Sequence, residues 1–498
     1  MRTLPLLTTL AAGASAGIVS APVVKRRFNL GTEMQKRDTL DLDALNNVTG
    51  GGYYAEFDVG TPGQKVSFLL DTGSSDTWVN SDDTDLCNSD ELQESYGFCM
   101  TTFNPDDSDT YKVVDRNGFD ITYLDTRRIR GDYFEDSINI DGKTIKKQQL
   151  GLASKSVRPT GIMGLGFSAN VAADKPYDTI IDNMVAQGLI DTAAFSLWLN
   201  DLESDEGTIL FGGLDKAKYV GKLATLPLLP EPGALGSNIT SFSVAIEGLE
   251  VNTPDGQDDV NLDGLESDAI AILDSGSTIC LLPDDQVKDI FDAFDVLSVQ
   301  NVAVPFVDCA YGDDKGDGIS FDFKFKGKTI SVPMKEMVIN AFEGKQETFQ
   351  DPRVSPLFKG WDSVCMFGIS SAADYGVKTD SFALLGDTFL RSAYVVYDLA
   401  NEQLGIAEAN PGTNDSDIVE LKADDKDFPD VSGVRSKSPT ATDGSSSSGT
   451  RPTVTVTAGS DASAGTSSDD GDDNAAGHLA PAFMATLMLA LGAVVAVM

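Results

Sequence analysis

The chain has 498 residues with 77 acidic against 37 basic side chains, and its formal net charge of −40 argues against nucleic acid and anionic membrane surfaces as partners. Its single histidine, His478, lies in a C-terminal region that we expect to be removed, so the mature protein has none for Ser-His-Asp or Cys-His catalysis. Five cysteines without C-x-x-C spacing, and the lack of the commonest zinc ligand, also argue against a metal site, which leaves paired carboxylates as the hydrolytic chemistry.

The first 20 residues have the pattern of a secretory signal peptide, in which Arg2 precedes an apolar stretch and small residues follow. Two positions, after Ala16 and after Ala21, fit the small-x-small pattern at which such peptides are cleaved. The sequence therefore predicts a secreted protein.

Two basic clusters come next, at 25–27 and 36–37. In a secreted chain the Lys36-Arg37 pair predicts cleavage by a kexin-type processing protease, with a solvated basic patch as the alternative. Cleavage there would make residues 21–37 a short prosegment and the protein a zymogen, with Asp38 as the mature N-terminus.

Short strands are predicted from Tyr53 onward. Residues 53–59 alternate in polarity, 61–64 form a turn, and 65–70 lead as an apolar strand into Asp71. Helical spacing is confined to 177–189 and 283–297. Mostly short strands over a stretch of this length favour two β-rich lobes, each with its own core. Prolines and glycines gather at 226–238, where the lobes are expected to meet.

Two similar motifs place an aspartate at the end of an apolar strand: Asp71-Thr72-Gly73-Ser74 and Asp274-Ser275-Gly276-Ser277. The glycine permits a tight turn, and the serine hydroxyl can hydrogen-bond the acid beside it. One copy is ordinary turn chemistry. Two copies, each followed at long range by a Gly-rich apolar run (161–166 and 383–387), predict two lobes that each give one carboxylate to a shared cleft.

These motifs, with 211–215 and 386–391, resemble the pepsin-like aspartic proteases (peptidase family A1), and in particular the fungal yapsin-type branch with a GPI anchor. The resemblance runs from about Tyr53 to Ala409. It implies an all-β, bilobal pepsin-like fold, with lobes at 38–230 and 231–410 and the active-site cleft between them. It also implies catalytic Asp71 and Asp274, no metal and no other cofactor. The supporting residues that it implies are Ser74 and Ser277, which hydrogen-bond the acids, Gly73 and Gly276 in the turns, and Thr72 and Ser275, which lock the two loops together.

Members of this family close a β-hairpin flap over the substrate through a tyrosine that reaches a tryptophan. By its place in the matched order, Tyr123 is the flap candidate and Trp78 its partner, whereas the alternative for Tyr123 is an aromatic residue in a strand core. The chain departs from the pattern after Tyr123, because Leu124-Asp125-Thr126 stands where relatives usually have glycine. We therefore expect a stiffer flap tip.

Asp125 lies near this tip, where relatives that cleave after Lys or Arg often carry an acid. Asp76 and the acidic loop 82–94 would add negative potential and favour basic substrates. The alternative is that Asp125 is a solvated turn residue, since turns are rich in Asp, and that the pocket accepts bulky apolar side chains.

The cysteines fit the oxidising compartment that a signal peptide implies. The resemblance implies two disulfides, in which Cys87 pairs with Cys99 and Cys309 pairs with Cys365. Cys280 is left over among apolar neighbours, which favours a buried inert thiol over a reactive one. Three sequons, at Asn47, Asn238 and Asn414, are candidates for N-glycosylation.

The composition changes after about Pro411. Residues 411–477 are rich in Ser, Thr, Gly and Asp and are expected to form a disordered stalk. An apolar run ends the chain, with small residues before it and no Lys or Arg after it. This pattern favours a GPI-attachment signal at 478–498, with Asn474 as candidate site, over a retained membrane span.

The sequence as a whole predicts a secreted, monomeric aspartic endopeptidase at the cell surface, attached to the plasma membrane or cell wall through the GPI lipid. It would hydrolyse peptide bonds of protein substrates at acidic pH through a water activated between two aspartates, and pepstatin-type inhibitors would bind it. The alternative is a non-catalytic homologue that acts as a binding or cell-wall protein. Such homologues normally lose an active-site Asp or Gly, whereas both are present here. A glycosidase also pairs carboxylates, but it would not explain the duplicated motifs.

Overall fold

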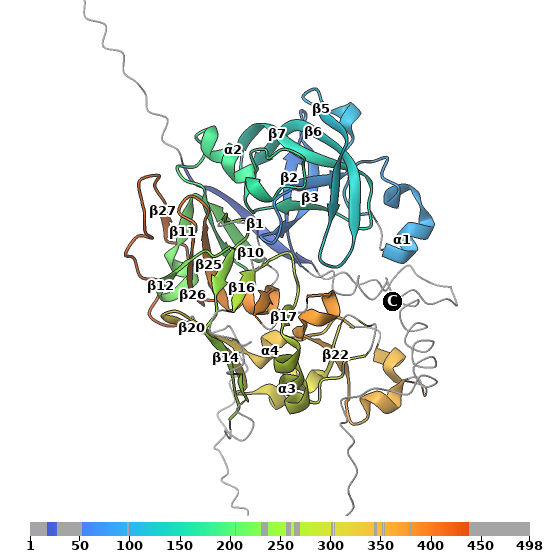
Figure 1. The fold of residues 1–498 in the computed structure, drawn as a ribbon, viewed down its shortest axis with the longest axis vertical. Coiled ribbons are helices and arrows are strands. Elements are labelled where there is room, and N and C mark those ends of the chain that lie inside the picture. Colours follow the sequence, from blue (N-terminus) through green and yellow to red (C-terminus); the bar gives the residue numbers. More distant parts are fainter. Residues whose placement is uncertain are drawn as a thin grey trace, which may run out of the picture.

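The computed structural model in Figure 1 describes residues 17–26 and 52–437, apart from short gaps at 97–98, 205, 231–237, 255–259, 263–268, 300–301, 303, 343–345, 351, 353 and 378–380. Several predictions fall outside the described residues: most of the signal peptide, the Lys36-Arg37 pair, the sequon at Asn47, the GPI candidate Asn474 and the terminal apolar run.

A large twisted sheet runs through the molecule and is drawn mainly in blue and green in Figure 1. Its strand order is β12-β26-β25-β9-β10-β1-β2-β3-β8-β4-β7-β6-β5. Strands from both ends of the chain therefore share one sheet, which crosses the predicted boundary between the lobes. The bounds of its strands are β1 Val19–Arg26, β2 Gly52–Val59, β3 Gln64–Asp71, β4 Thr77–Asn80, β5 Lys112–Thr122, β6 Arg128–Ile140, β7 Lys143–Lys155, β8 Gly161–Gly164, β9 Ala194–Trp198, β10 Glu206–Phe211, β12 Tyr219–Pro227, β25 Ala393–Asp398 and β26 Gln403–Ala409.

Smaller sheets build most of the C-terminal lobe, in yellow and orange in Figure 1. Their orders are β13-β16-β24-β17-β23, β15-β14-β19-β20 and β18-β22-β21, and β11 pairs with β27. The described chain is thus mostly β-sheet in two lobes, as predicted. The bounds are β11 Gly213–Asp215, β13 Ser243–Ala245, β14 Gly248–Asn252, β15 Val260–Leu262, β16 Ile270–Leu273, β17 Cys280–Leu282, β18 Phe306–Asp308, β19 Ser320–Phe325, β20 Lys328–Pro333, β21 Val338–Ile339, β22 Val364–Phe367, β23 Ile369–Ser371, β24 Phe382–Leu385 and β27 Ile418–Glu420.

The same arrangement of strands occurs once in each lobe and carries the two aspartate motifs. In the first lobe β3 pairs in parallel with β8, so that Asp71 lies opposite Gly164. In the second lobe β16 pairs in parallel with β24 and ends at Leu273, directly before Asp274. The Gly-rich apolar runs therefore recur because each one is the strand that pairs with an aspartate-bearing strand.

Helices are short and few in the described residues. They are α1 Asp90–Tyr96, α2 Ile180–Ala186, α3 Asp284–Phe294, α4 Met334–Met337 and α5 Asp387–Leu390. α2 and α3 fall inside the two predicted helical stretches, and both bury apolar residues against the main core. Among the residues that the structure describes, none of these helices has the length and apolar character needed to cross a membrane.

β1 places part of the predicted prosegment inside the large sheet. It pairs with β10 over Val19–Val24 and with β2 over Val24–Arg26. Val19, Ala21 and Val23 are buried in the main core. Cleavage after Ala16 would leave this strand complete, whereas cleavage after Ala21 would remove its first three residues.

The first residues of the predicted stalk, 411–437, belong to the folded body. Residues 411–437 pack on the body: β27 pairs with β11, and Val434 bridges Val220. Leu421 is buried, and Phe428 and Val431 pack against the same apolar cluster. The prediction was wrong for 411–437 because the few apolar residues of this polar segment gain burial from contacts with distant strands.

Candidate active site

Asp71 and Asp274 come from different lobes and meet at the centre of the molecule. Each accepts the same pair of hydrogen bonds. The backbone N–H of Gly73 donates to Asp71 Oδ1 and that of Gly276 donates to Asp274 Oδ1, both at 2.8 Å. The hydroxyls of Ser74 and Ser277 donate to the Oδ2 atoms. These bonds fix the plane of each carboxyl group relative to its own loop.

The two motif glycines are required because each lies against the opposite carboxyl. A Cβ on Gly73 would lie 2.5 Å from Asp274 Oδ1, and one on Gly276 would lie 2.3 Å from Asp71 Oδ1. Any larger residue would push the aspartates apart. The sequence pattern Asp-Ser/Thr-Gly therefore encodes the close approach of the two carboxyl groups.

Thr72 and Ser275 lock the two aspartate loops together through four hydrogen bonds. Thr72 Oγ1 donates to the Leu273 carbonyl at 2.8 Å and accepts from the Ser275 backbone N–H at 2.9 Å. In the mirror arrangement, Ser275 Oγ donates to the Leu70 carbonyl at 2.8 Å and accepts from the Thr72 N–H at 3.2 Å. Both side chains are fully buried. The network fixes the positions of the two aspartates relative to each other, although they belong to different lobes.

The electrostatics of the pair favour a shared proton. Burial, and next the negative charge of Asp71, raise the pKa of Asp274 to about 7. Two carboxyls in contact cannot both ionise at mildly acidic pH without a large repulsive cost. The arrangement is that of one acid and one base in the same site.

Tyr123 lies where the sequence predicts the flap. It lies in the turn between β5 and β6, directly after the last residue of β5. Its hydroxyl accepts a hydrogen bond from Trp78 Nε1 at 2.7 Å. Its backbone N–H donates to Arg127 O at 2.9 Å, and the tip turns back through Thr126 at a φ of 66°. The left-handed residue of the tip is therefore Thr126, and not Leu124, which directly follows the tyrosine.

A cleft of about 420 Å³ contains both aspartates and lies under the flap. From the first lobe it is lined by Tyr123, Leu124 and Asp125, and from the second by Ile279, Leu281 and Tyr375, among others. Both acids and the flap therefore face one concave space between the lobes, large enough for part of a peptide.

The carboxylates of Asp125 and Asp76, which the sequence predicted to favour basic substrates, both have partners within the chain. Asp125 lines the cleft, but its carboxylate forms ion pairs with Arg158 at 2.7 Å and with Arg127 at 3.7 Å. Asp76 does not line the cleft, and its contribution to substrate steering stays a prediction. It is fully buried and accepts hydrogen bonds from Tyr133, Tyr177 and the Ala172 N–H, while burial raises its pKa.

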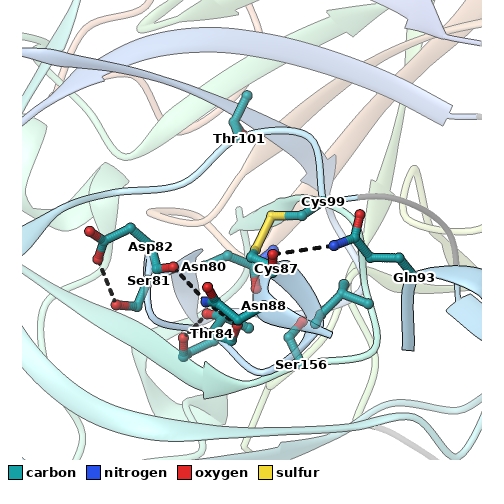
Figure 2. Close-up of a disulfide and its surroundings, with 12 residues drawn as sticks. Asn80, Ser81, Asp82, Thr84, Cys87, Asn88, Gln93, Cys99, Thr101 and Ser156 are labelled. Atoms are coloured by element: carbon teal, nitrogen blue, oxygen red, sulfur yellow. Dashed lines mark hydrogen bonds between the residues drawn. A yellow bond between two sulfur atoms is a disulfide. The ribbon is translucent and has the colours of Figure 1, made fainter. Parts of the chain in front are cut away.

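The structure joins Cys87 to Cys99 and Cys309 to Cys365, which is the pairing that the resemblance implies. Figure 2 shows the first disulfide within a dense set of hydrogen bonds, among them Gln93 Nε2 to the Cys87 carbonyl at 3.2 Å. Cys280 is buried, and burial raises the pKa of its thiol to about 11. This environment agrees with an inert rather than a reactive thiol.

A two-lobed β fold that brings one carboxyl from each lobe into contact, beneath a tyrosine-bearing hairpin, defines an aspartic hydrolase. A family model described as eukaryotic aspartyl protease matches residues 52–409, which include both motifs and the flap. The chain therefore belongs to the eukaryotic aspartyl protease family, and it is an aspartic-type endopeptidase.

Curated relatives agree with this assignment. The chain is 34% identical to "Probable aspartic-type endopeptidase opsB" of Aspergillus fumigatus over 424 residues, which cover 84% of this chain and 79% of that protein. It is 34% identical to "Acid protease" of Saccharomycopsis fibuligera over 72% of this chain and 80% of that protein. With "Aspartic proteinase yapsin-3" of Saccharomyces cerevisiae the identity is 28%, over 84% and 79% of the two chains. The matches place it among fungal relatives.

Sequence reasoning missed Arg158, which lines the cleft and pairs with Asp125. This arginine stands three residues before β8, the strand that pairs with β3, in a polar stretch that also carries Lys155. No local pattern marks it as a cleft residue, because its partner Asp125 lies 33 positions earlier in the sequence.

Proposed function

We propose that the protein is a GPI-anchored endopeptidase of the cell surface that acts at acidic pH through a water held between Asp71 and Asp274. The observation that carries this proposal is the buried carboxyl pair, in which the pKa of Asp274 is raised to about 7. Burial raises the pKa of Asp274, so the pair retains a proton in the resting enzyme. The proton nevertheless belongs to the coupled pair, because the two groups titrate together.

In the first step Asp71 takes a proton from the water while Asp274 donates its proton toward the carbonyl oxygen of the scissile bond. The water oxygen bonds to the carbonyl carbon and forms a tetrahedral diol. Proton transfer from Asp71 to the leaving amine then breaks the C–N bond, and Asp274 recovers its proton. The fixed hydrogen bonds at the carboxyls keep both groups aligned throughout.

Secretion and surface attachment rest on the signal peptide and the C-terminal pattern. Two further features support this location. Both described lobes contain a disulfide, and the sequon asparagines Asn238 and Asn414 are exposed. The described part of the body reaches residue 437, which leaves the polar residues 438–477 as the proposed stalk before an anchor at 478–498.

Processing after Lys36-Arg37 would divide the chain between β1 and β2. We infer that β1 is the prosegment part of the zymogen, because it lies before the basic pair and is paired on both sides in the large sheet. A kexin-type protease would make this cut.

A preference for basic residues would require Asp125 to meet the substrate. Its ion pairs with Arg158 and Arg127 weigh against this preference, and the role of Arg158 is developed below.

The proposal is tested by expression of the full chain in a fungal host and of a form that stops at residue 437. We expect the full chain on the cell surface, released by a phosphatidylinositol-specific phospholipase, and the shorter form active in the medium. Both should cleave peptides below about pH 6 and be blocked by pepstatin, whose hydroxyl mimics the tetrahedral species. A full chain that phospholipase never releases would contradict the anchor, and full activity in excess pepstatin would contradict the chemistry.

A further inference from the structure

The Asp125 carboxylate at the flap tip is held by two cations of its own chain. Arg158 Nη2 donates to Asp125 Oδ2 at 2.7 Å, and Arg127 Nε lies 3.7 Å from the same oxygen. The Arg127 backbone N–H also donates to Oδ1 at 3.1 Å. The side chains of Arg158 and Asp125 are only 19% and 26% exposed, so this ion pair is partly shielded from solvent.

The Arg158 guanidinium also lies over the ring of Tyr123, with its carbon 4.8 Å from the ring centroid. The same group therefore contacts both the flap tyrosine and the flap acid. Since Tyr123, Asp125 and Arg158 all line the cleft, the guanidinium occupies the position beside Asp125 that a lysine or arginine of a substrate would need.

The backbone that carries Arg158 is firmly anchored. Asn80 Nδ2 donates to the Arg158 carbonyl at 3.0 Å, and the Met100 N–H donates to the Pro159 carbonyl at 2.8 Å. Asp85 Oδ1 accepts from the Ser156 N–H at 2.9 Å. Asp85 and Met100 flank the Cys87–Cys99 loop, and Figure 2 draws Ser156 among the surroundings of this disulfide. The guanidinium therefore extends from a well-anchored segment of the first lobe to the turn of the flap hairpin.

We propose that Arg158 is a specificity-determining residue that blocks the cation site beside Asp125. The enzyme consequently disfavours basic side chains in the pocket under the flap and accepts uncharged or acidic ones. A substrate cation would have to displace a preorganised guanidinium, and beside Asp125 it would meet two arginines. This inference rests on the proposed peptidase function and names the charge selectivity of the same site.

The test uses sets of three peptides that are identical except for one residue, which is Lys, Leu or Glu. Each set places this residue at a different position on either side of the scissile bond. The wild-type enzyme should cleave the Lys peptide least well at the position that enters this pocket. Arg158→Met should raise the Lys-to-Leu ratio of kcat/KM about tenfold, mainly through a lower KM, because Asp125 becomes free to pair with the substrate.

Three further variants make the result specific. Arg158→Lys should stay near the wild-type ratio, because it keeps a cation beside Asp125. Arg158→Met combined with Asp125→Asn should lose the gain, because the carboxylate that would bind the substrate cation is absent. Arg128→Met is the matched control: Arg128 lies on the same hairpin, pairs with Asp120 and does not line the cleft, so the ratio should not change.

An active Arg158→Met enzyme with a Lys-to-Leu ratio within about twofold of wild type would overturn the inference and leave the proposed function standing. A wild-type enzyme that cleaves the Lys peptide at least as well as the Leu peptide at every position would do the same, even if Arg158→Met did not fold. A wild-type protein that cleaves none of the peptides would overturn the proposed function and this inference together.

Discussion

Thr72→Val should weaken the contact between the lobes while keeping the size and shape of the side chain. The substitution removes the hydroxyl that donates to the Leu273 carbonyl and accepts from the Ser275 N–H. Both partners belong to the second lobe and come from residues that are fully buried, so neither group can turn to solvent. The change thus breaks two of the four cross-lobe hydrogen bonds at the aspartates.

The expected cost follows from the two backbone groups that are left without partners. Each buried donor or acceptor that loses its hydrogen bond costs about 1–3 kcal/mol, so the free energy of unfolding should fall by about 2–6 kcal/mol. The substitution should also slow the reaction, because small displacements of reacting groups lower the rate by up to about 100-fold. We expect kcat to fall between tenfold and about 100-fold.

Urea unfolding at acidic pH, followed by tryptophan fluorescence, gives the stability change, and peptide cleavage gives kcat. Thr77→Val is a matched control, because Thr77 is equally buried and its hydroxyl has no hydrogen-bond partner in the described part of the chain. The control should change the unfolding free energy by less than about 1 kcal/mol. If Thr72→Val behaved like Thr77→Val in both assays, the assignment of Thr72 as a lock between the lobes would be refuted.

Three further predictions concern pH, the flap and the C-terminal segment. The pKa of Asp274 is raised to about 7 in the folded protein, so between about pH 4 and 7 this group binds more protons in the folded state than in the unfolded state. Its contribution to stability therefore falls as pH rises through this range. Urea midpoints of the wild type should fall more steeply with pH than those of Asp274→Asn. Tyr123→Phe leaves the buried Trp78 N–H without its acceptor and should lower kcat/KM about tenfold, whereas an unchanged kcat/KM would contradict the flap assignment. A chain that ends at residue 437 should be secreted folded, but one that ends at 410 uncovers the apolar cluster and should lose several kcal/mol of stability, measured by its melting temperature.

The parts that were predictable are those whose cause is local in the sequence. Each aspartate motif combines an apolar strand, a carboxylate and a glycine within a few residues, and these residues determine the turn at which each acid lies. α2 and α3 were predictable from apolar residues at helical spacing. Alternating polarity and turns predicted two β-rich lobes, whereas the pepsin-like arrangement and the disulfide pairing came from the resemblance to a family.

The parts that were not predictable depend on partners far along the chain. Asp76 resembled a surface acid, yet it is buried because Tyr133 and Tyr177 supply its hydrogen bonds from other segments. The ion pair of Arg158 with Asp125 likewise joins residues that no local pattern connects. Residues 411–437 have a polar composition, and only their docking on distant strands gives them structure.

The central claim is that Asp71 and Asp274 share one proton and activate the attacking water. Its most direct test is kcat of purified Asp71→Asn and Asp274→Asn, with Asp120→Asn as a control because Asp120 is an exposed carboxylate paired with Arg128 outside the cleft. Each active-site variant should fold, as judged by circular dichroism, and lose about 1000-fold or more in kcat, whereas the control should retain it. Turnover above about 1% of wild type in either folded active-site variant would contradict the account.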